Sequence, residues 1–163
     1  MPSAVYGLAE IDREEIVNAK LVANPGCYAT CAILSIYPLI KEGIIDINSI
    51  IIDAKSGVTG AGRNATVDSL FCEVNETMKA YKTASHRHIP EIESIINEYT
   101  SAKNFHLVFN PHLIPIERGI YVDAYAKLNK NLTALEIIDI FKKYYGNEKF
   151  VRIYDENTTP EVR

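Results

Sequence analysis

The sequence of 163 residues lacks the features that mark membrane, secreted and nucleic-acid-binding proteins. Apolar runs such as Ile50–Ile52 are far shorter than the roughly 20 residues that cross a bilayer. The first residues do not combine a positive segment with an apolar stretch, as a signal peptide would. The net charge is only −4, and no run of Lys and Arg forms a basic stripe. We therefore expect a globular cytoplasmic protein with neither membrane nor nucleic acid as a partner.

The usual glycine-rich motifs for nucleotides are also absent. No Rossmann fingerprint follows a predicted strand, and no Walker-type loop occurs. The segment Lys55–Arg63 spaces its glycines as G-x-x-G-x-G, which matches neither motif. We expect this chain to have no dinucleotide site of its own. The segment does carry a cation at each end, and its N–H groups could bind an anion, although an ordinary hairpin loop has the same composition.

Cysteine is scarce, and its three residues, Cys27, Cys31 and Cys72, cannot all pair within one chain. Without a secretory signal we expect reduced thiols. A free cysteine is usually a small buried hydrophobe, so a reactive role needs local evidence. A zinc site that adds histidines is an alternative. However, the spacing C-x-x-x-C with no second cysteine pair does not match the usual zinc motifs.

The composition, with 47% apolar and 23% charged residues, is that of a globular domain with a proper core. No repeat, low-complexity tract or linker interrupts the chain, so we expect one domain over residues 1–163. Apolar periodicity and capping signals predict helices over residues 28–41, 90–100 and 133–145. Apolar runs and alternation predict strands over residues 19–23, 49–54, 107–110, 120–128 and 149–154. This order of elements predicts a mixed sheet with helices packed on it, of α/β or α+β type.

Cys27 has the most reactive position of the three cysteines. It follows the turn Asn24-Pro25-Gly26 and precedes a predicted helix, whose free N–H groups and dipole would stabilise a thiolate. The same N–H groups could hold the oxyanion that forms when a thiolate attacks an acyl carbon. The alternative is a buried cysteine beside a turn. Cys31, one helical turn further on, and Cys72 are more typical of packing.

The segment His86-Arg87-His88 places two imidazoles and a guanidinium just before a predicted helix. Histidine is the side chain best suited to proton transfer at neutral pH. Arginine can bind a carboxylate or phosphate through two parallel hydrogen bonds. The alternative is a polar loop that happens to hold two histidines.

Five segments in this order resemble the N-acetyl-gamma-glutamyl-phosphate reductase family of arginine biosynthesis, a relative of aspartate-semialdehyde dehydrogenase. They are residues 5–10, 23–30, 55–63, 86–92 and 109–119. Ala29, Thr59 and Ile116 depart from residues common in the family, but none of these changes removes a reactive group.

The resemblance implies an oxidoreductase in which the Cys27 thiolate attacks an acyl phosphate and expels phosphate. Hydride from NADPH then reduces the thioester to N-acetylglutamate 5-semialdehyde. His86 and His88 both match the family's catalytic pair, and the resemblance does not decide which is the general acid/base. The residues that it assigns to substrate binding are Asn24, Ser56, Gly57, Arg63, Arg87 and Arg118.

The resemblance also implies that a Rossmann domain binding NADPH precedes this catalytic and dimerisation domain, and that a terminal segment follows it. The fragment is then expected to be inactive alone and to form a homodimer. Two alternatives remain: a related reductase acting on aspartyl phosphate or a carrier-bound acyl phosphate, and a non-catalytic dimerisation or zinc-binding module.

Overall fold

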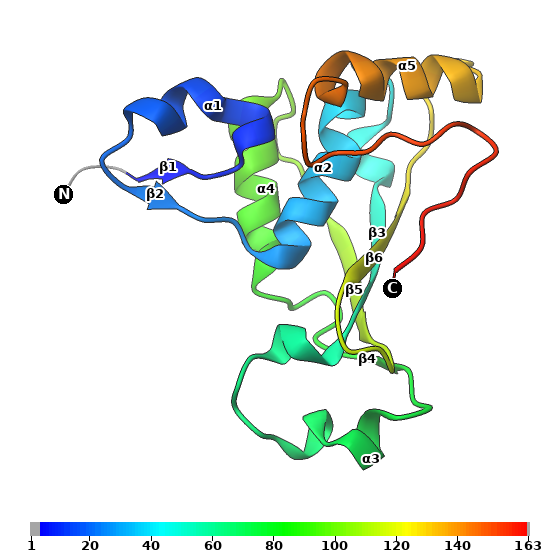
Figure 1. Cartoon of the computed structure of the whole chain (residues 1–163). Coiled ribbons are helices and arrows are strands. Elements are labelled where there is room, and N and C mark those ends of the chain that lie inside the picture. Colours follow the sequence, from blue (N-terminus) through cyan, green and yellow to red (C-terminus); the bar gives the residue numbers. More distant parts are fainter. Residues whose placement is uncertain (1–3, 163) are drawn as a thin grey trace.

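The computed structural model describes residues 4–162, which form a mixed four-stranded sheet with helices against it and a smaller two-stranded pair beside it (Figure 1). The helices are α1 (Ala9–Asn18), α2 (Cys27–Lys41), α3 (Phe71–Val74), α4 (His88–Tyr99) and α5 (Ala134–Tyr145). The strands are β1 (Val5–Tyr6), β2 (Val22–Ala23), β3 (Ile51–Ser56), β4 (Lys79–Ala80), β5 (Val108–Leu113) and β6 (Ile120–Tyr125). Short 3-10 helices span Ile47–Ser49 (η1), Val58–Ala61 (η2) and Val67–Ser69 (η3).

The main sheet has the strand order β4-β5-β3-β6. Strands β3 and β5 run parallel, with Ile51 opposite Val108 and Ser56 opposite Leu113. The other two pairings, β3 with β6 and β4 with β5, are antiparallel. Because β3 and β5 are parallel, their carboxyl ends meet at one edge of the sheet.

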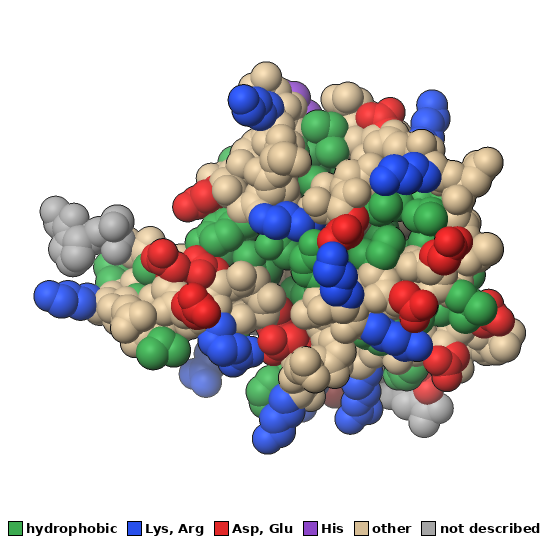
Figure 2. Space-filling model, turned by 90° about the horizontal axis from the view of Figure 1, so that it is seen from above, with side chains coloured by type: hydrophobic (Ala, Val, Ile, Leu, Met, Phe, Trp, Pro, Cys, Tyr) green, Lys and Arg blue, Asp and Glu red, His purple; other side chains and the backbone are tan. Residues whose placement is uncertain are grey.

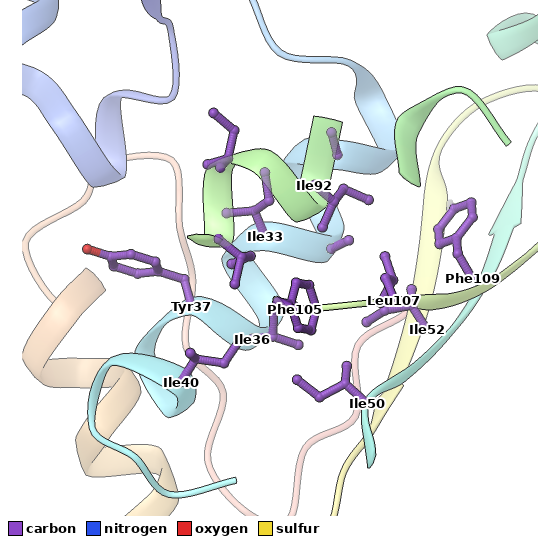
Figure 3. Packing of buried hydrophobic residues seen from close by; sticks show 14 of the residues in the cluster. Ile33, Ile36, Tyr37, Ile40, Ile50, Ile52, Ile92, Phe105, Leu107 and Phe109 are labelled. Carbon is purple, nitrogen blue, oxygen red and sulfur yellow. The ribbon is translucent and has the colours of Figure 1, made fainter. Parts of the chain in front are cut away.

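One face of this sheet packs on α2 and α4 and forms the core (Figure 3). Along β3 the side chains alternate, so that Ile52 and Ala54 are fully buried while Ile51 is 44% exposed. Ile33 of α2 and Ile92 of α4 are also fully buried, and the two helices contact each other. The predicted α/β class is confirmed. The packing of α2 and α4 on the sheet fixes the positions of their first residues.

The other face of the sheet is open. Ile51, Val108 and Tyr125 are each more than two-fifths exposed on this face, so no helix of the described chain covers them. At its centre the ammonium group of Lys55 lies 2.8 Å from a carboxylate oxygen of Asp53. The same group lies 2.6 Å from Asp123, which stands opposite Asp53 on β6. We call these apolar and polar residues the open sheet face.

Charged side chains of both signs are interspersed on the face that carries α1 and α5, without a patch of one sign (Figure 2). No described helix is long and apolar enough to cross a membrane.

The predicted strand over residues 149–154 is wrong, because this segment has no sheet partner in the described chain. Phe150, which would have been packed in a strand, is 87% exposed. The N–H of Val151 instead donates to the carbonyl of Glu148, which is the geometry of a turn. Local β propensity does not make a strand where no neighbour offers hydrogen bonds.

Strand β5 is longer than predicted, because it passes through Pro111 to Leu113. A proline removes one N–H from the ladder, and prolines therefore avoid central strands. Here the neighbouring strand β4 has only two residues, and the carbonyl of Pro111 still accepts from the N–H of Tyr81. Residues 110–113 therefore belong to the sheet.

The observed helices agree with the predicted ones more closely than the strands do. α2 begins at Cys27, one residue before the predicted start, and α5 begins after the Thr133 capping box. α4 begins at His88, so Pro90 is its third residue and not its first. The prediction omitted α1, α3, β1, β4 and the 3-10 helices.

Ile92→Ala should lower the free energy of unfolding by about 2–5 kcal/mol, because it opens a cavity between α4 and α2. Urea unfolding followed by circular dichroism measures this change. Val17→Ala is the matched control, since Val17 is 76% exposed on α1, and it should change stability by about 0.5 kcal/mol or less. Equal effects of the two substitutions would contradict the assigned core.

Candidate active site

A cavity of about 500 Å³ lies where α2 and α4 begin and where β3 and β5 end. Cys27 and Tyr28 reach it from the start of α2, His88 from the start of α4, and Ser56 and Leu113 from the strand ends. The rest of its lining comes from the segment between β3 and α4: Gly60, Ala61, Thr66, Asp68, Ser69, Lys79, Tyr81, Lys82, His86 and Arg87.

The nucleophile candidate Cys27 is exposed and is the first residue of α2. Gly26 precedes it with extended backbone angles, and the carbonyl of Gly26 accepts the first helical hydrogen bond, from the N–H of Thr30. The N–H groups before Thr30 therefore have no partner within the helix. They lie at the positive end of the helix dipole, where a thiolate or an oxyanion is stabilised.

The turn that presents Cys27 packs directly on His88. A Cβ atom placed on Gly26 would lie 2.4 Å from Nε2 of His88, so a side chain at this position would have to displace the imidazole ring. The Glu91 carboxylate holds the same turn, because its Oε1 accepts hydrogen bonds from the N–H of Gly26 at 3.0 Å and from the hydroxyl of Tyr6 at 2.8 Å. Its Oε2 lies 3.9 Å from Nε2 of His88. Glu91 was not among the residues predicted from the sequence; its spacing of three residues from His88 was the available signal.

The two histidines are buried side by side, with ring centroids 4.8 Å apart. Nδ1 of His86 accepts a hydrogen bond from the N–H of His88 at 3.2 Å. Burial, reinforced by the positive charges of His88, Lys82 and Arg87, lowers the pKa of His86 to about 4. Burial also lowers the pKa of His88, but the Glu91 carboxylate opposes that shift.

Two tyrosines form the wall behind the histidines. The Tyr28 hydroxyl donates to the carbonyl of His112 at 3.2 Å, and the Tyr81 hydroxyl donates to the Tyr28 oxygen at 3.3 Å. Both rings meet the ring of His86 edge-on. Burial raises the pKa of both hydroxyl groups, so they stay protonated and act as hydrogen-bonding supports. Neither tyrosine was predicted from the sequence.

The cavity wall is rich in cations. Lys79 is paired with Asp68 at 2.6 Å, which leaves Lys82 and Arg87 as the lining cations without a carboxylate partner among the described residues. Arg87 was expected from the sequence, whereas Lys82 was not. An anionic substrate would meet both charges at the mouth of the Cys27 site.

The structure brings five of the predicted site residues together around this cavity: Cys27, Ser56, His86, Arg87 and His88. Gly57 is next to it, and its backbone packs on the chain at Glu117, where a Cβ atom would approach within 2.8 Å. This close approach explains why residue 57 is a glycine, since a side chain would meet the backbone at Glu117.

The other three predicted residues lie outside the cavity lining. Asn24 is exposed in the turn before Cys27. Arg63 lines a different, largely apolar cavity of about 450 Å³ on the far side of η2. Arg118 is exposed and lies near Gly57 through its backbone nitrogen. The sequence shows that Arg63 and Arg118 are cations, but it does not reveal which cations face Cys27.

The glycine-rich segment Lys55–Arg63 does not form a Rossmann-type dinucleotide site. The glycine-rich turn after β3 leads into η2, which has four residues, and so lacks the long helix whose N-terminus binds a pyrophosphate. Within residues 4–162 no group of three or more His, Cys, Asp or Glu side chains could hold a metal ion.

The fold and the cavity define an α/β domain that presents a cysteine at a helix N-terminus beside two histidines. The chain belongs to the semialdehyde dehydrogenase family: residues 27–163 match the family model described as "Semialdehyde dehydrogenase, dimerisation domain".

Named relatives agree with this assignment. The chain is 57% identical over all 163 residues to an N-acetyl-gamma-glutamyl-phosphate reductase of Campylobacter jejuni subsp. doylei, and covers 47% of that protein. It is 56% identical over the same length to the enzyme of that name from Lachnoclostridium phytofermentans, again covering 47%. The chain thus spans about half the length of the curated relatives it matches, and the resemblance noted in the sequence is confirmed.

Solved structures confirm the fold. Aspartate semialdehyde dehydrogenase II from Vibrio cholerae superimposes with a TM-score of 0.63 at 13% identity, covering 88% of this chain and 49% of that one. The enzyme from Francisella tularensis gives a TM-score of 0.60 at 13% identity, covering 86% and 51%. At this identity the likeness shows the architecture alone.

Iodoacetamide should label Cys27 faster than Cys31 and Cys72 at neutral pH. Cys31 is partly covered, and burial raises the pKa of its thiol, so its thiolate is rarer. Cys72 is as exposed as Cys27 but lies on a helix of only four residues. Mass spectrometry of peptides from timed reactions gives the three rates. Labelling of Cys27 at or below the rate of Cys72 would contradict an activated thiol.

Proposed function

We propose that the full-length enzyme containing this chain reduces N-acetyl-gamma-glutamyl phosphate to N-acetylglutamate 5-semialdehyde, and that this domain supplies the nucleophile. The observation that carries the proposal is the exposed Cys27 thiol at the start of α2, in one cavity with His86 and His88. The names of the relatives that match the whole chain support this substrate.

In the first step, the Cys27 thiolate attacks the acyl carbon of the substrate and forms a C–S bond. The free N–H groups at the start of α2 stabilise the resulting oxyanion. The oxyanion then collapses, the bond from carbon to the phosphate oxygen breaks, and phosphate leaves with that electron pair. The product of this step is a thioester on Cys27.

His88 is the better placed histidine for moving protons, because its Nε2 lies against the turn that carries Cys27 and close to Glu91. We assign it the removal of the thiol proton before attack and the return of a proton when the aldehyde forms. Glu91 orients the imidazole and favours its charged form.

Lys82 and Arg87 provide the positive charge for the anionic substrate, and Ser56 offers a hydroxyl group in the same cavity. Ordered cations at the mouth of a cavity raise the local concentration of anions and hold them. Reduction of the thioester needs a hydride donor, and we assign that role to NADPH bound by the remainder of the full-length enzyme.

We also propose that the open sheet face is the contact surface between two copies of this chain. The matching family is described as a dimerisation domain, and this face exposes a row of apolar residues, Ile51, Val108 and Tyr125, beside the cluster of Asp53, Lys55 and Asp123. Exposed apolar residues beside paired charged side chains are typical of a surface that a partner covers. The three free thiols suit a reducing compartment, and we place the enzyme in the cytoplasm.

Cys27→Ser in the full-length enzyme should abolish NADPH oxidation, because a hydroxyl group at this position is a far weaker nucleophile. The rate with N-acetyl-gamma-glutamyl phosphate should fall by about 10⁴-fold or more. Cys31→Ser is the matched control, one helical turn further on, and should stay within about tenfold of the parent. Substantial turnover by the Cys27 variant would remove the thioester mechanism, and reduction by the 163-residue chain alone would contradict the need for a separate cofactor domain.

Val108→Glu should weaken the dimer at least tenfold, since it introduces an unpaired charge into the proposed contact. Sedimentation velocity over a range of concentrations measures the dissociation constant. Val17→Glu, an equal change on the exposed face of α1, should leave it unchanged. A dimer of normal affinity in the Val108 variant would place the contact elsewhere.

A further inference from the structure

We propose that the two histidines have different tasks: His86 stays neutral and donates a hydrogen bond from Nε2 to an oxygen of the bound acyl phosphate, whereas His88 carries the proton. This inference rests on the proposed function and names the residue that recognises the reacting group of the substrate. Three observations lead to it.

The first observation is the hydrogen bond at Nδ1 of His86. The N–H of His88, the first residue of α4, donates to this nitrogen at 3.2 Å. A backbone N–H can only donate, so Nδ1 must be the acceptor of the pair. A neutral imidazole with an accepting Nδ1 carries its hydrogen on Nε2. Protonation of Nδ1 would set two donors against each other and break this bond.

The second observation is the charge around His86. Its nearest charged groups are all cationic: Lys82 and Arg87 from its own loop, and His88 from the start of α4. The positive end of the α4 dipole also faces it. The remaining neighbours are uncharged rings, namely Tyr28 of α2, Tyr81 of the loop before His86, and Phe109 of β5.

No carboxylate contributes to the balance of charge at His86, in contrast to His88, which Glu91 approaches. Burial acts in the same direction as the cations, and the pKa of His86 falls to about 4. At any pH above about 5 the ring is therefore neutral and keeps its Nε2 hydrogen.

The third observation is that Nε2 of His86 is left for a ligand. The ring is 7% exposed and lines the cavity with Cys27. Nε2 has no hydrogen-bond partner among residues 4–162, although Nδ1 is used. A fixed donor in a partly dry cavity stabilises developing negative charge better than water does. A neutral imidazole at a helix N-terminus serves as such a donor in other enzymes.

The fixed ring makes this role specific. Edge-to-face contacts with Tyr28 and Tyr81, at centroid distances of 5.6 and 5.8 Å, hold the imidazole plane. The bond to the His88 N–H fixes which edge faces the cavity. The ring therefore cannot turn to exchange donor and acceptor without losing the hydrogen bond from the His88 N–H.

The experiment uses the full-length enzyme and compares His86→Gln with His86→Asn. The glutamine amide nitrogen lies near the position of Nε2 and keeps a donor for the substrate, whereas the asparagine amide reaches only the position of Nδ1. We expect kcat/KM to fall about a hundredfold or more in His86→Asn, as when an oxyanion donor is removed, and about tenfold or less in His86→Gln. His88→Gln should instead remove a limb of the pH–rate profile, which both His86 variants keep.

Imidazole nitrogen NMR of the full-length enzyme, assigned with His86→Gln, gives a test that does not depend on the substrate. His86 should show the neutral Nε2–H tautomer from pH 5.5 to 8. Protonation of His86 near pH 6.5 would overturn the proposal, as would loss of the pH limb in His86→Gln or equal activity of the two variants.

The two proposals fail in different ways. If the parent enzyme does not reduce N-acetyl-gamma-glutamyl phosphate, the proposed function fails, and the NMR result still decides the state of His86. If it does reduce this substrate and His86 titrates, only the division of tasks fails.

Discussion

The contact between Gly26 and the ring of His88 is the constraint on which the site depends. It joins the start of α2 to the start of α4 so closely that any side chain on residue 26 would push the His88 ring away. The hydrogen bond from the Gly26 N–H to Glu91 holds the same junction from the other side. Because the buried isoleucines of α2 and α4 fix the two helices against one sheet face, the approach of nucleophile and imidazole follows from the packing of the core (Figure 3).

The sequence predicted the parts of the fold whose signals are local. Apolar periodicity marked α2, α4 and α5 to within two residues, because one face of each helix must be buried. The strand predictions were weaker, since a strand needs a neighbour that local sequence does not reveal. The segment 149–154 has strand-forming residues and no partner, while β5 crosses Pro111 because β3 and β4 flank it.

The residues of the candidate site also divide into those with a local sequence signal and those without one. Cys27, His86 and His88 were recognisable because a turn, a helix start and the residue type occur within a few positions of each other. The tyrosines behind the histidines gave no such signal, because Tyr28 and Tyr81 meet only when α2 and the segment after β4 pack together. Cations were the hardest group to place. Lys79 is near Cys27 but is paired with Asp68, Arg63 faces another cavity, and Lys82 was not singled out.

His112 of β5 contributes to both faces of the main sheet. Its backbone carbonyl accepts the Tyr28 hydroxyl and so supports the cavity wall. Its imidazole belongs to the opposite face of the sheet, where Nδ1 lies 3.0 Å from a carboxylate oxygen of Asp53. Residues of a strand alternate between faces, but the backbone is shared by both. A partner that covers the open sheet face would therefore rest on the same strand that positions Tyr28.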